Sequence, residues 1–258
     1  MENNNLIELG QEEYDNGHFE EAIEYFNKAI QNNPDDFDTM ISRGMAKSQL
    51  GMHEDAIRDF TAALAIDPKN MDALFARAGA NCILGKYSDA IPDFSTLIEL
   101  EPRNDFFYAE RGSMYYNIGN YESSLWDYTR AIRINPNNFV AFNGRGSCNF
   151  ELKQYADAVK DFNATLKMEP LNVDAFIKRG KAHFELNNYE RACKDFTEAL
   201  AIDPENTDAL IGRSLIFSAL DMPNDAIDDL TEVLKIDPHN SVAPEILDLI
   251  ITRLDVED

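Results

Sequence analysis

Residues 139–172 read FVAFNGRGSCNFELKQYADAVKDFNATLKMEPLN, and the same pattern recurs before and after them along nearly the whole chain. A proline stands at position 32 of this unit, and prolines follow one another at a constant spacing of 34 residues. Such a fixed period indicates a tandem array of one structural unit. These prolines are Pro34, Pro68, Pro102, Pro136, Pro170, Pro204 and Pro238. The predicted repeats are 3–36, 37–70, 71–104, 105–138, 139–172, 173–206 and 207–240, followed by a tail, 241–258.

Other positions of the unit predict two helices, over roughly positions 2–14 and 18–31. Small residues recur at positions 8 and 20, as in Gly146 and Ala158, and an aromatic ring recurs at position 24, as in Phe162. The small residues let two helix backbones approach closely, and the ring fills the space beside them. Asn172 and its equivalents at position 34 are expected to cap the next first helix.

Glycine at 8, alanine at 20, an aromatic at 24 and proline at 32 together resemble the tetratricopeptide repeat family. The resemblance covers about residues 3–240. It implies an all-α fold, a right-handed α-solenoid of seven helix-turn-helix repeats whose first helices line a concave groove, and a function in protein binding rather than catalysis. The tail, 241–258, is expected to form a capping helix, which a repeat array needs for solubility, with an acidic end. Self-association through this helix is the alternative interpretation of its apolar residues.

A polar pattern departs from the family, which usually has a large aliphatic residue at position 7. Position 7 is arginine and position 23 is aspartate in the same six repeats, always 16 residues apart. The arginine fork suits a carboxylate, so structural ion pairs are predicted between first and second helices, within one repeat or between neighbours. An active site that includes His183 is disfavoured, because the pair recurs. The pairs are Arg43 and Asp59, Arg77 and Asp93, Arg111 and Asp127, Arg145 and Asp161, Arg179 and Asp195, and Arg213 and Asp229.

The family's geometry places positions 5, 6, 9 and 12 on the concave wall. In repeats 2–7, three of these 24 residues are charged, against 19 of 36 at the outward positions of the second helices. Lys178 and Lys181 are expected to form a local positive spot. Rings in successive repeats predict a peptide-binding groove, and packing between first helices is the alternative explanation. The predicted groove residues are Phe75, Gly79, Tyr116, Asn143, Ser147, Phe150, Ile177, Lys178, Lys181, Phe184 and Ile211.

Composition and missing motifs narrow the classes of function. The chain has 47 acidic and 23 basic residues and a net charge of −24, which disfavours nucleic acid and anionic membranes as partners. No signal peptide is recognised, and the scattered Cys82, Cys148 and Cys193 fit a reducing, cytoplasmic location. The histidines and cysteines lack the spacing of metal ligands, and no phosphate loop or nucleophile motif is present, so no metal, cofactor or enzyme activity is expected.

Two binding modes known in the family can also be compared with these residues. This sequence lacks the residues that form the carboxylate clamp of chaperone-tail binders. It also lacks the asparagine ladder of the sugar-transferase type. Position 9, for example, reads Met45, Gly79, Ser113, Ser147 and Lys181 in repeats 2–6. The sequence therefore predicts a non-catalytic scaffold or adaptor that binds an extended peptide or a helix of a partner protein. The alternatives are a self-assembling homo-oligomer through the C-terminal helix and a regulatory partner of an enzyme on another chain.

Overall fold

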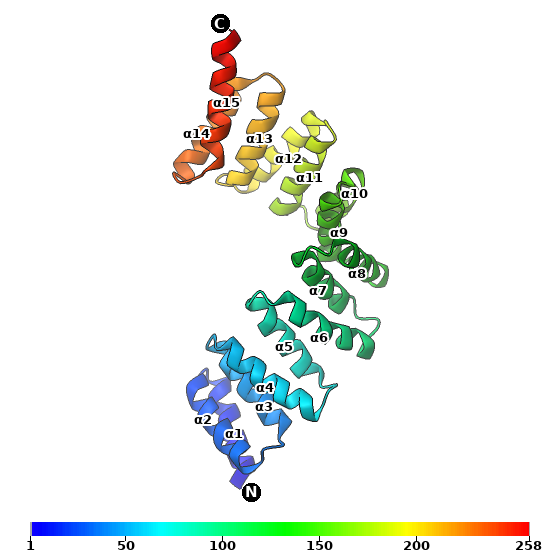
Figure 1. Ribbon diagram of the computed structural model, residues 1–258, viewed down its shortest axis with the longest axis vertical. Helices are drawn as coiled ribbons and strands as arrows, with labels where there is room; N and C mark the ends of the chain where they lie inside the picture. The colour runs from blue at the N-terminus through cyan, green and yellow to red at the C-terminus, as the bar shows by residue number, and fades with distance from the viewer. Residues whose placement is uncertain (1, 258) are drawn as a thin grey trace. The chain divides into compact units, whose positions relative to one another are not determined.

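The computed structural model describes the backbone of residues 2–257 and the side chains of residues 3–253. Within these limits every element is an α-helix, and short turns join fifteen helices. The predicted all-α fold is therefore confirmed, with antiparallel helix hairpins that follow one another in chain order (Figure 1). The predicted C-terminal helix is α15(Val242–Glu257), and Asp258 at the end of the predicted acidic tail lies outside the described residues.

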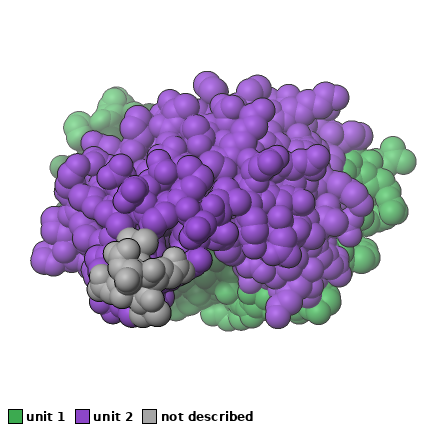
Figure 2. All heavy atoms as spheres, turned by 90° about the horizontal axis from the view of Figure 1, so that it is seen from above, with its two compact units in different colours: residues 1–135 green, residues 136–258 purple. Residues whose placement is uncertain are grey.

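The chain divides into two compact units, residues 1–135 and 136–258 (Figure 2). In unit 1, each helix packs on the next along the chain. Its helices are α1(Glu2–Asp15), α2(Phe19–Asn32), α3(Phe37–Gln49), α4(His53–Ile66), α5(Met71–Ile83), α6(Tyr87–Leu100), α7(Asp105–Asn117) and α8(Tyr121–Ile134).

Unit 2 has the same construction and ends with the additional helix α15, which packs on α14. The first helices of successive hairpins, α9, α11 and α13, also contact one another along one side of the unit. Its helices are α9(Phe139–Glu151), α10(Tyr155–Met168), α11(Val173–Glu185), α12(Tyr189–Ile202), α13(Thr207–Ala219), α14(Pro223–Ile236) and α15.

The hairpins close as the small residues predict. At Gly146 on α9, an added Cβ would lie 2.8 Å from the ring of Phe162 on α10, so the two helices approach closely at this point. Alanine at position 20 is fully buried wherever it occurs, as at Ala158. The rings at position 24 form the centre of each hairpin: Phe26, Phe60, Phe94, Tyr128, Phe162 and Phe196 are all at most 5% exposed.

Caps and turns set the limits of the helices. The side chain of Asn172 accepts a hydrogen bond of 2.9 Å from the backbone N–H of Ala175, which confirms the predicted N-cap. The turn inside each hairpin has a residue in the left-handed conformation at position 15. This residue is glycine in unit 1, whereas unit 2 has Lys153, Asn187 and Asp221 there. At Lys153, with φ of 59°, the conformation costs about 1 kcal/mol relative to glycine.

Candidate functional site

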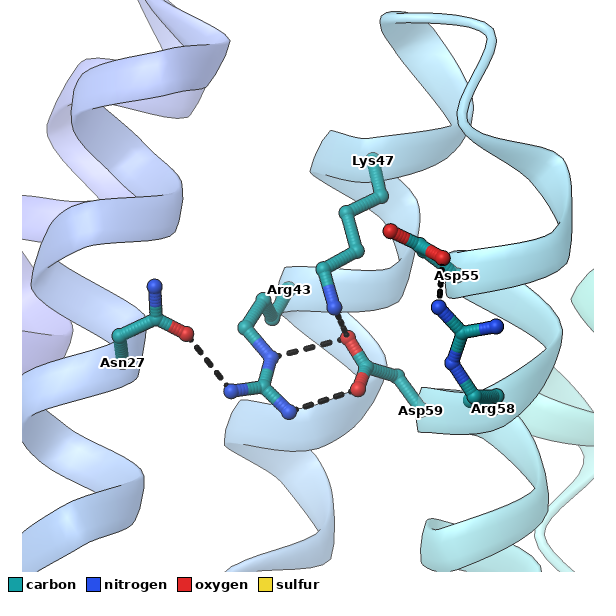
Figure 3. A network of polar contacts seen from close by, with 6 residues as sticks. All are labelled: Asn27, Arg43, Lys47, Asp55, Arg58 and Asp59. Atoms are coloured by element: carbon teal, nitrogen blue, oxygen red, sulfur yellow. Dashed lines mark hydrogen bonds and ion pairs between the residues drawn. The ribbon is translucent and has the colours of Figure 1, made fainter.

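The arginine and aspartate side chains form ion pairs within each hairpin, which settles the choice between the same repeat and its neighbour. In α3, the Nε and Nη2 atoms of Arg43 donate to the two oxygens of Asp59 on α4 at 2.9 and 2.6 Å (Figure 3). The same two-point contact recurs in all six predicted pairs, and every aspartate is buried. The six pairs are therefore structural, because each joins the two helices of its own hairpin.

In five hairpins the same arginine also reaches the preceding second helix. Nη1 of Arg43 donates to Asn27 on α2 at 2.7 Å, so one guanidinium connects three helices (Figure 3). Position 11 extends this polar seam, since Lys47 contacts Asp59 at 2.7 Å and Asn149 donates to Asp161 at 2.9 Å. The other arginines that reach a side chain 16 residues earlier are Arg77, Arg111, Arg179 and Arg213, which contact Thr61, Ser95, Asn163 and Thr197.

His183 occupies position 11 on α11, and histidine is the residue type whose unperturbed pKa lies near neutral pH. It is 6% exposed, and its Nδ1 atom has no hydrogen-bond partner among the described atoms. Burial lowers the pKa of His183 below its ordinary value of 6.5; Arg179 and Arg191 lower it further, and Asp195 opposes the shift. The folded protein therefore holds this ring in its neutral form.

We expect His183→Asn to remove part of the acid sensitivity of the protein. In wild type the unfolded chain binds a proton at His183 more readily than the folded chain, so stability falls as pH falls through about 6.5. Asparagine does not titrate, and Asn149 shows that it can bond the seam aspartate, which adds about 1 kcal/mol. Thermal unfolding at pH 7.5 and 5.5 measures the effect, with exposed His239→Asn as the control. If the melting temperature of His183→Asn falls between pH 7.5 and 5.5 by as much as that of wild type, this account is wrong.

An apolar hollow among the helices of unit 2 brings together four of the predicted groove residues. Phe150 on α9, Phe184 on α11 and Ile211 on α13 line a space of about 270 Å³, with Lys181 at its edge. Each ring is held by a tyrosine at the start of the following helix: Phe150 lies 5.3 Å from Tyr155, and Phe184 lies 5.6 Å from Tyr189, between ring centroids. Both phenylalanines remain partly exposed, so the rings are fixed in place and still open to a ligand.

A second hollow of about 250 Å³ continues this surface toward the C-terminal helix. It lies between α13 and α15, and its apolar lining includes Ile246, Leu249 and Ile250. Leu215 lines both hollows and is 38% exposed, so its side chain borders both spaces. We call the two neighbouring hollows together the unit 2 trough.

Sequence reasoning missed several residues of this trough, namely Leu215, Glu185 and the two cap residues Ile246 and Leu249. Three of these residues occupy repeat positions that were expected on the concave wall. Residue 215 stands at position 9, and when the 34-residue numbering is continued into the tail, residues 246 and 249 stand at positions 6 and 9. The apolar excess of the tail therefore has a second explanation besides self-association, because Ile246 and Leu249 extend the inner wall of the unit.

The expected positive spot is neutralised in the structure. Lys178 pairs with Asp174 at 2.9 Å, and Lys181 pairs with Asp208 at 3.5 Å. Asp174 also accepts a 3.0 Å hydrogen bond from the side chain of Asn143. The acidic residues in the first turns of α11 and α13 thus balance the lysines, in addition to their interaction with the helix dipole.

Two of the predicted groove residues do not reach the open surface. Ser147 is 5% exposed and donates to the backbone oxygen of Asn143, and Ile177 is 7% exposed and belongs to the apolar core of unit 2. For these two residues the prediction of ligand contact is wrong. Both stand on first helices, and these helices contact one another along unit 2.

The predicted groove residues of unit 1 form a separate aromatic surface. Phe75 is 44% exposed and lies 5.8 Å from Phe106, which is itself 45% exposed, between ring centroids. An added Cβ at Gly79 would meet no atom within 4 Å, so this glycine faces open space. Tyr116 packs on Tyr121 at 5.4 Å, as the rings of unit 2 pack on their tyrosines. Phe106 was not predicted, because it stands at position 2, where four other repeats carry aspartate.

Groups that could carry chemistry are few among the described side chains. Burial and the charge of Glu110 raise the pKa of the Cys82 thiol to about 11, which leaves little of the nucleophilic thiolate. Within residues 3–253 there is no cluster of histidine, cysteine and carboxylate side chains that could hold a metal ion. None of the described helices has the length and apolar character that crossing a bilayer requires.

Comparison with protein families agrees with the repeated hairpin geometry. Models of the tetratricopeptide repeat match residues 4–36 and, in overlapping segments, residues 41–241. The chain belongs to the tetratricopeptide repeat family. Comparison with curated proteins gave no match.

Solved structures of other tetratricopeptide repeat proteins share the fold at low sequence identity. The C-terminal part of one from Cytophaga hutchinsonii is 18% identical with a TM-score of 0.75, and the match covers 93% of this chain and 98% of that one. One from Parabacteroides merdae is 21% identical with a TM-score of 0.69, over 96% and 98%. YrrB, described as having an unusual peptide-binding site, is 23% identical with a TM-score of 0.62, over 72% and 95%. At these identities the likeness shows the fold.

Proposed function

We propose that this tetratricopeptide repeat protein is a non-catalytic scaffold that holds an apolar segment of a partner protein in the unit 2 trough. The observation that carries the proposal is the pair of hollows that share Leu215, with packed and partly exposed rings lining one and the cap residues lining the other. Each hollow exceeds the cavity of about 150 Å³ that holds a benzene ring in an engineered protein. Each therefore has room for a large apolar side chain of the partner.

The distribution of polar groups supports this proposal over an enzyme. The buried ion pairs repeat from hairpin to hairpin and stabilise helix packing, whereas a catalytic centre needs a single converging set of groups. The trough instead offers apolar lining with a few polar groups at its edge, as peptide-binding grooves do. The peptide-binding site named for YrrB is a precedent for this function in the same fold. The three free cysteines fit a reducing compartment, so we also propose a cytoplasmic location.

Self-assembly through the C-terminal helix is a second candidate, favoured by Leu249 and Ile251, which are 71% and 47% exposed. The net charge of −24 opposes it, since two copies repel each other unless the contact is strongly apolar. Light scattering over a range of protein concentrations separates the two proposals, because a monomer at high concentration excludes a self-assembled scaffold.

Selection from a random peptide library displayed on phage tests the scaffold proposal. Peptides enriched on the wild-type chain are expected to lose at least about tenfold in affinity when Phe150→Ala and Phe184→Ala are combined, because two anchoring rings of the hollow are removed. A second variant, Leu215→Gln with Leu249→Gln, changes exposed side chains and so preserves the helix packing. Circular dichroism confirms that both variants are folded. Unchanged affinity in both, or no enriched peptide at all, would overturn the proposal.

A further inference from the structure

The edge of the trough carries an excess of negative charge. Glu185, Asp208 and Lys181 line the first hollow, and Lys181 is paired with Asp208 at 3.5 Å. Among the described residues no ion pair involves Glu185, which is exposed. One carboxylate at the hollow is thus left without a cationic partner.

Glu185 lies beside the aromatic pair that borders the hollow. It is at the C-terminal end of α11, one residue after Phe184, and burial and the nearby charge of Glu185 raise the pKa of Tyr155 at the start of α10. Tyr155 in turn packs against Phe150, whose ring centroid is 5.3 Å away. A carboxylate and a packed aromatic ring therefore border the same space.

We infer that the partner segment is basic as well as apolar: its apolar side chains fill the trough, and a lysine or arginine beside them pairs with Glu185. The inference rests on the proposed function and adds the chemistry of the partner. Charge complementarity supports a basic partner segment both at the hollow and over longer distances. Glu185 offers a local contact, and the net charge of −24 attracts cationic segments and repels anionic ones. The lysines expected to form a positive spot, Lys178 and Lys181, are paired instead with Asp174 and Asp208.

The test uses the full chain and the peptides enriched by display as probes. These peptides are expected to contain more lysine and arginine than the unselected library. Replacement of a basic residue by glutamine in an enriched peptide should weaken binding to wild type and have a smaller effect on Glu185→Gln. A coupling of about two- to fivefold between the two changes is expected at physiological salt, the range for partly exposed ion pairs. Glu185 is exposed, so the glutamine variant should fold as wild type does.

Glu198→Gln is the matched control, since it removes the same charge from an exposed position on α12 outside the trough. It should show no coupling to the peptide charge, because salt screens separated charges. The inference would be overturned if the enriched peptides contained no excess of lysine and arginine. It would also be overturned if the peptide substitution and Glu185→Gln had independent effects, or if Glu198→Gln coupled to the peptide charge equally. In those cases the loss of binding in Phe150→Ala with Phe184→Ala would still support the scaffold. Failure of that variant to lose binding contradicts the scaffold itself.

Discussion

Replacement of Asp161 by alanine is expected to lower the free energy of unfolding by about 3–5 kcal/mol, the range for removal of one partner from a buried ion pair. Arg145 donates to Asp161 from Nε at 3.0 Å and from Nη2 at 2.6 Å, and Asn149 donates to it at 2.9 Å. The carboxylate is 4% exposed. Its removal leaves a half-buried guanidinium and a buried amide without their acceptor. Urea unfolding followed by circular dichroism gives the change.

Asp157→Ala is the matched control on the same helix. Asp157 pairs with Lys160 at 2.7 Å, but both side chains are more than half exposed, so its loss should change stability by less than about 0.5 kcal/mol. Combining Asp161→Ala with Arg145→Met should recover part of the loss, because the unpaired charge is then absent. A similar small effect for Asp157→Ala and Asp161→Ala would show that the Arg145–Asp161 pair does not stabilise the hairpin.

Gly212→Ala is expected to destabilise the protein by about 1–3 kcal/mol, the usual cost of inserting a methyl group into a packed core. A Cβ at this position of α13 would lie 2.9 Å or less from three carbon atoms of the Phe196 ring on α12. Phe196 is 1% exposed and belongs to the core of unit 2, so a shift of the ring disturbs the packing of that core. Thermal unfolding measures the effect.

Gly79→Ala is the opposite case and serves as the control. Gly79 also lies inside a first helix, α5, but an added Cβ would meet nothing within 4 Å. Alanine is a better helix former than glycine, so this variant should gain about 0.5–1 kcal/mol. If both variants shift the melting temperature in the same direction, the close approach at Gly212 is not what determines the outcome.

The period of 34 residues and the residue types at positions 8, 20, 24 and 34 determined the fold class from the sequence alone. These signals are local: a cap such as Asn172, a small residue such as Gly146 and a ring such as Phe162 act within one hairpin or at its end. The constant separation of arginine and aspartate likewise identified the six buried pairs of these two residue types. Each pair lies within one hairpin, and the hairpin geometry is the same in every repeat. The pairs could therefore be predicted without knowing how distant parts of the chain are arranged.

Only the tertiary structure decided which inner residues are open to a ligand. Ile177 is buried and Phe184 is partly exposed, although both stand at positions expected on the inner wall, because Ile177 belongs to the core of unit 2 and Phe184 packs at the border of that core. The pairing of Lys181 with Asp208 joins α11 to α13 across 27 residues. Exposure and charge balance depend on such contacts between hairpins. The sequence pattern of a single repeat does not predict contacts between hairpins. The trough and the unpaired carboxylate of Glu185 are therefore seen only in the stacked hairpins.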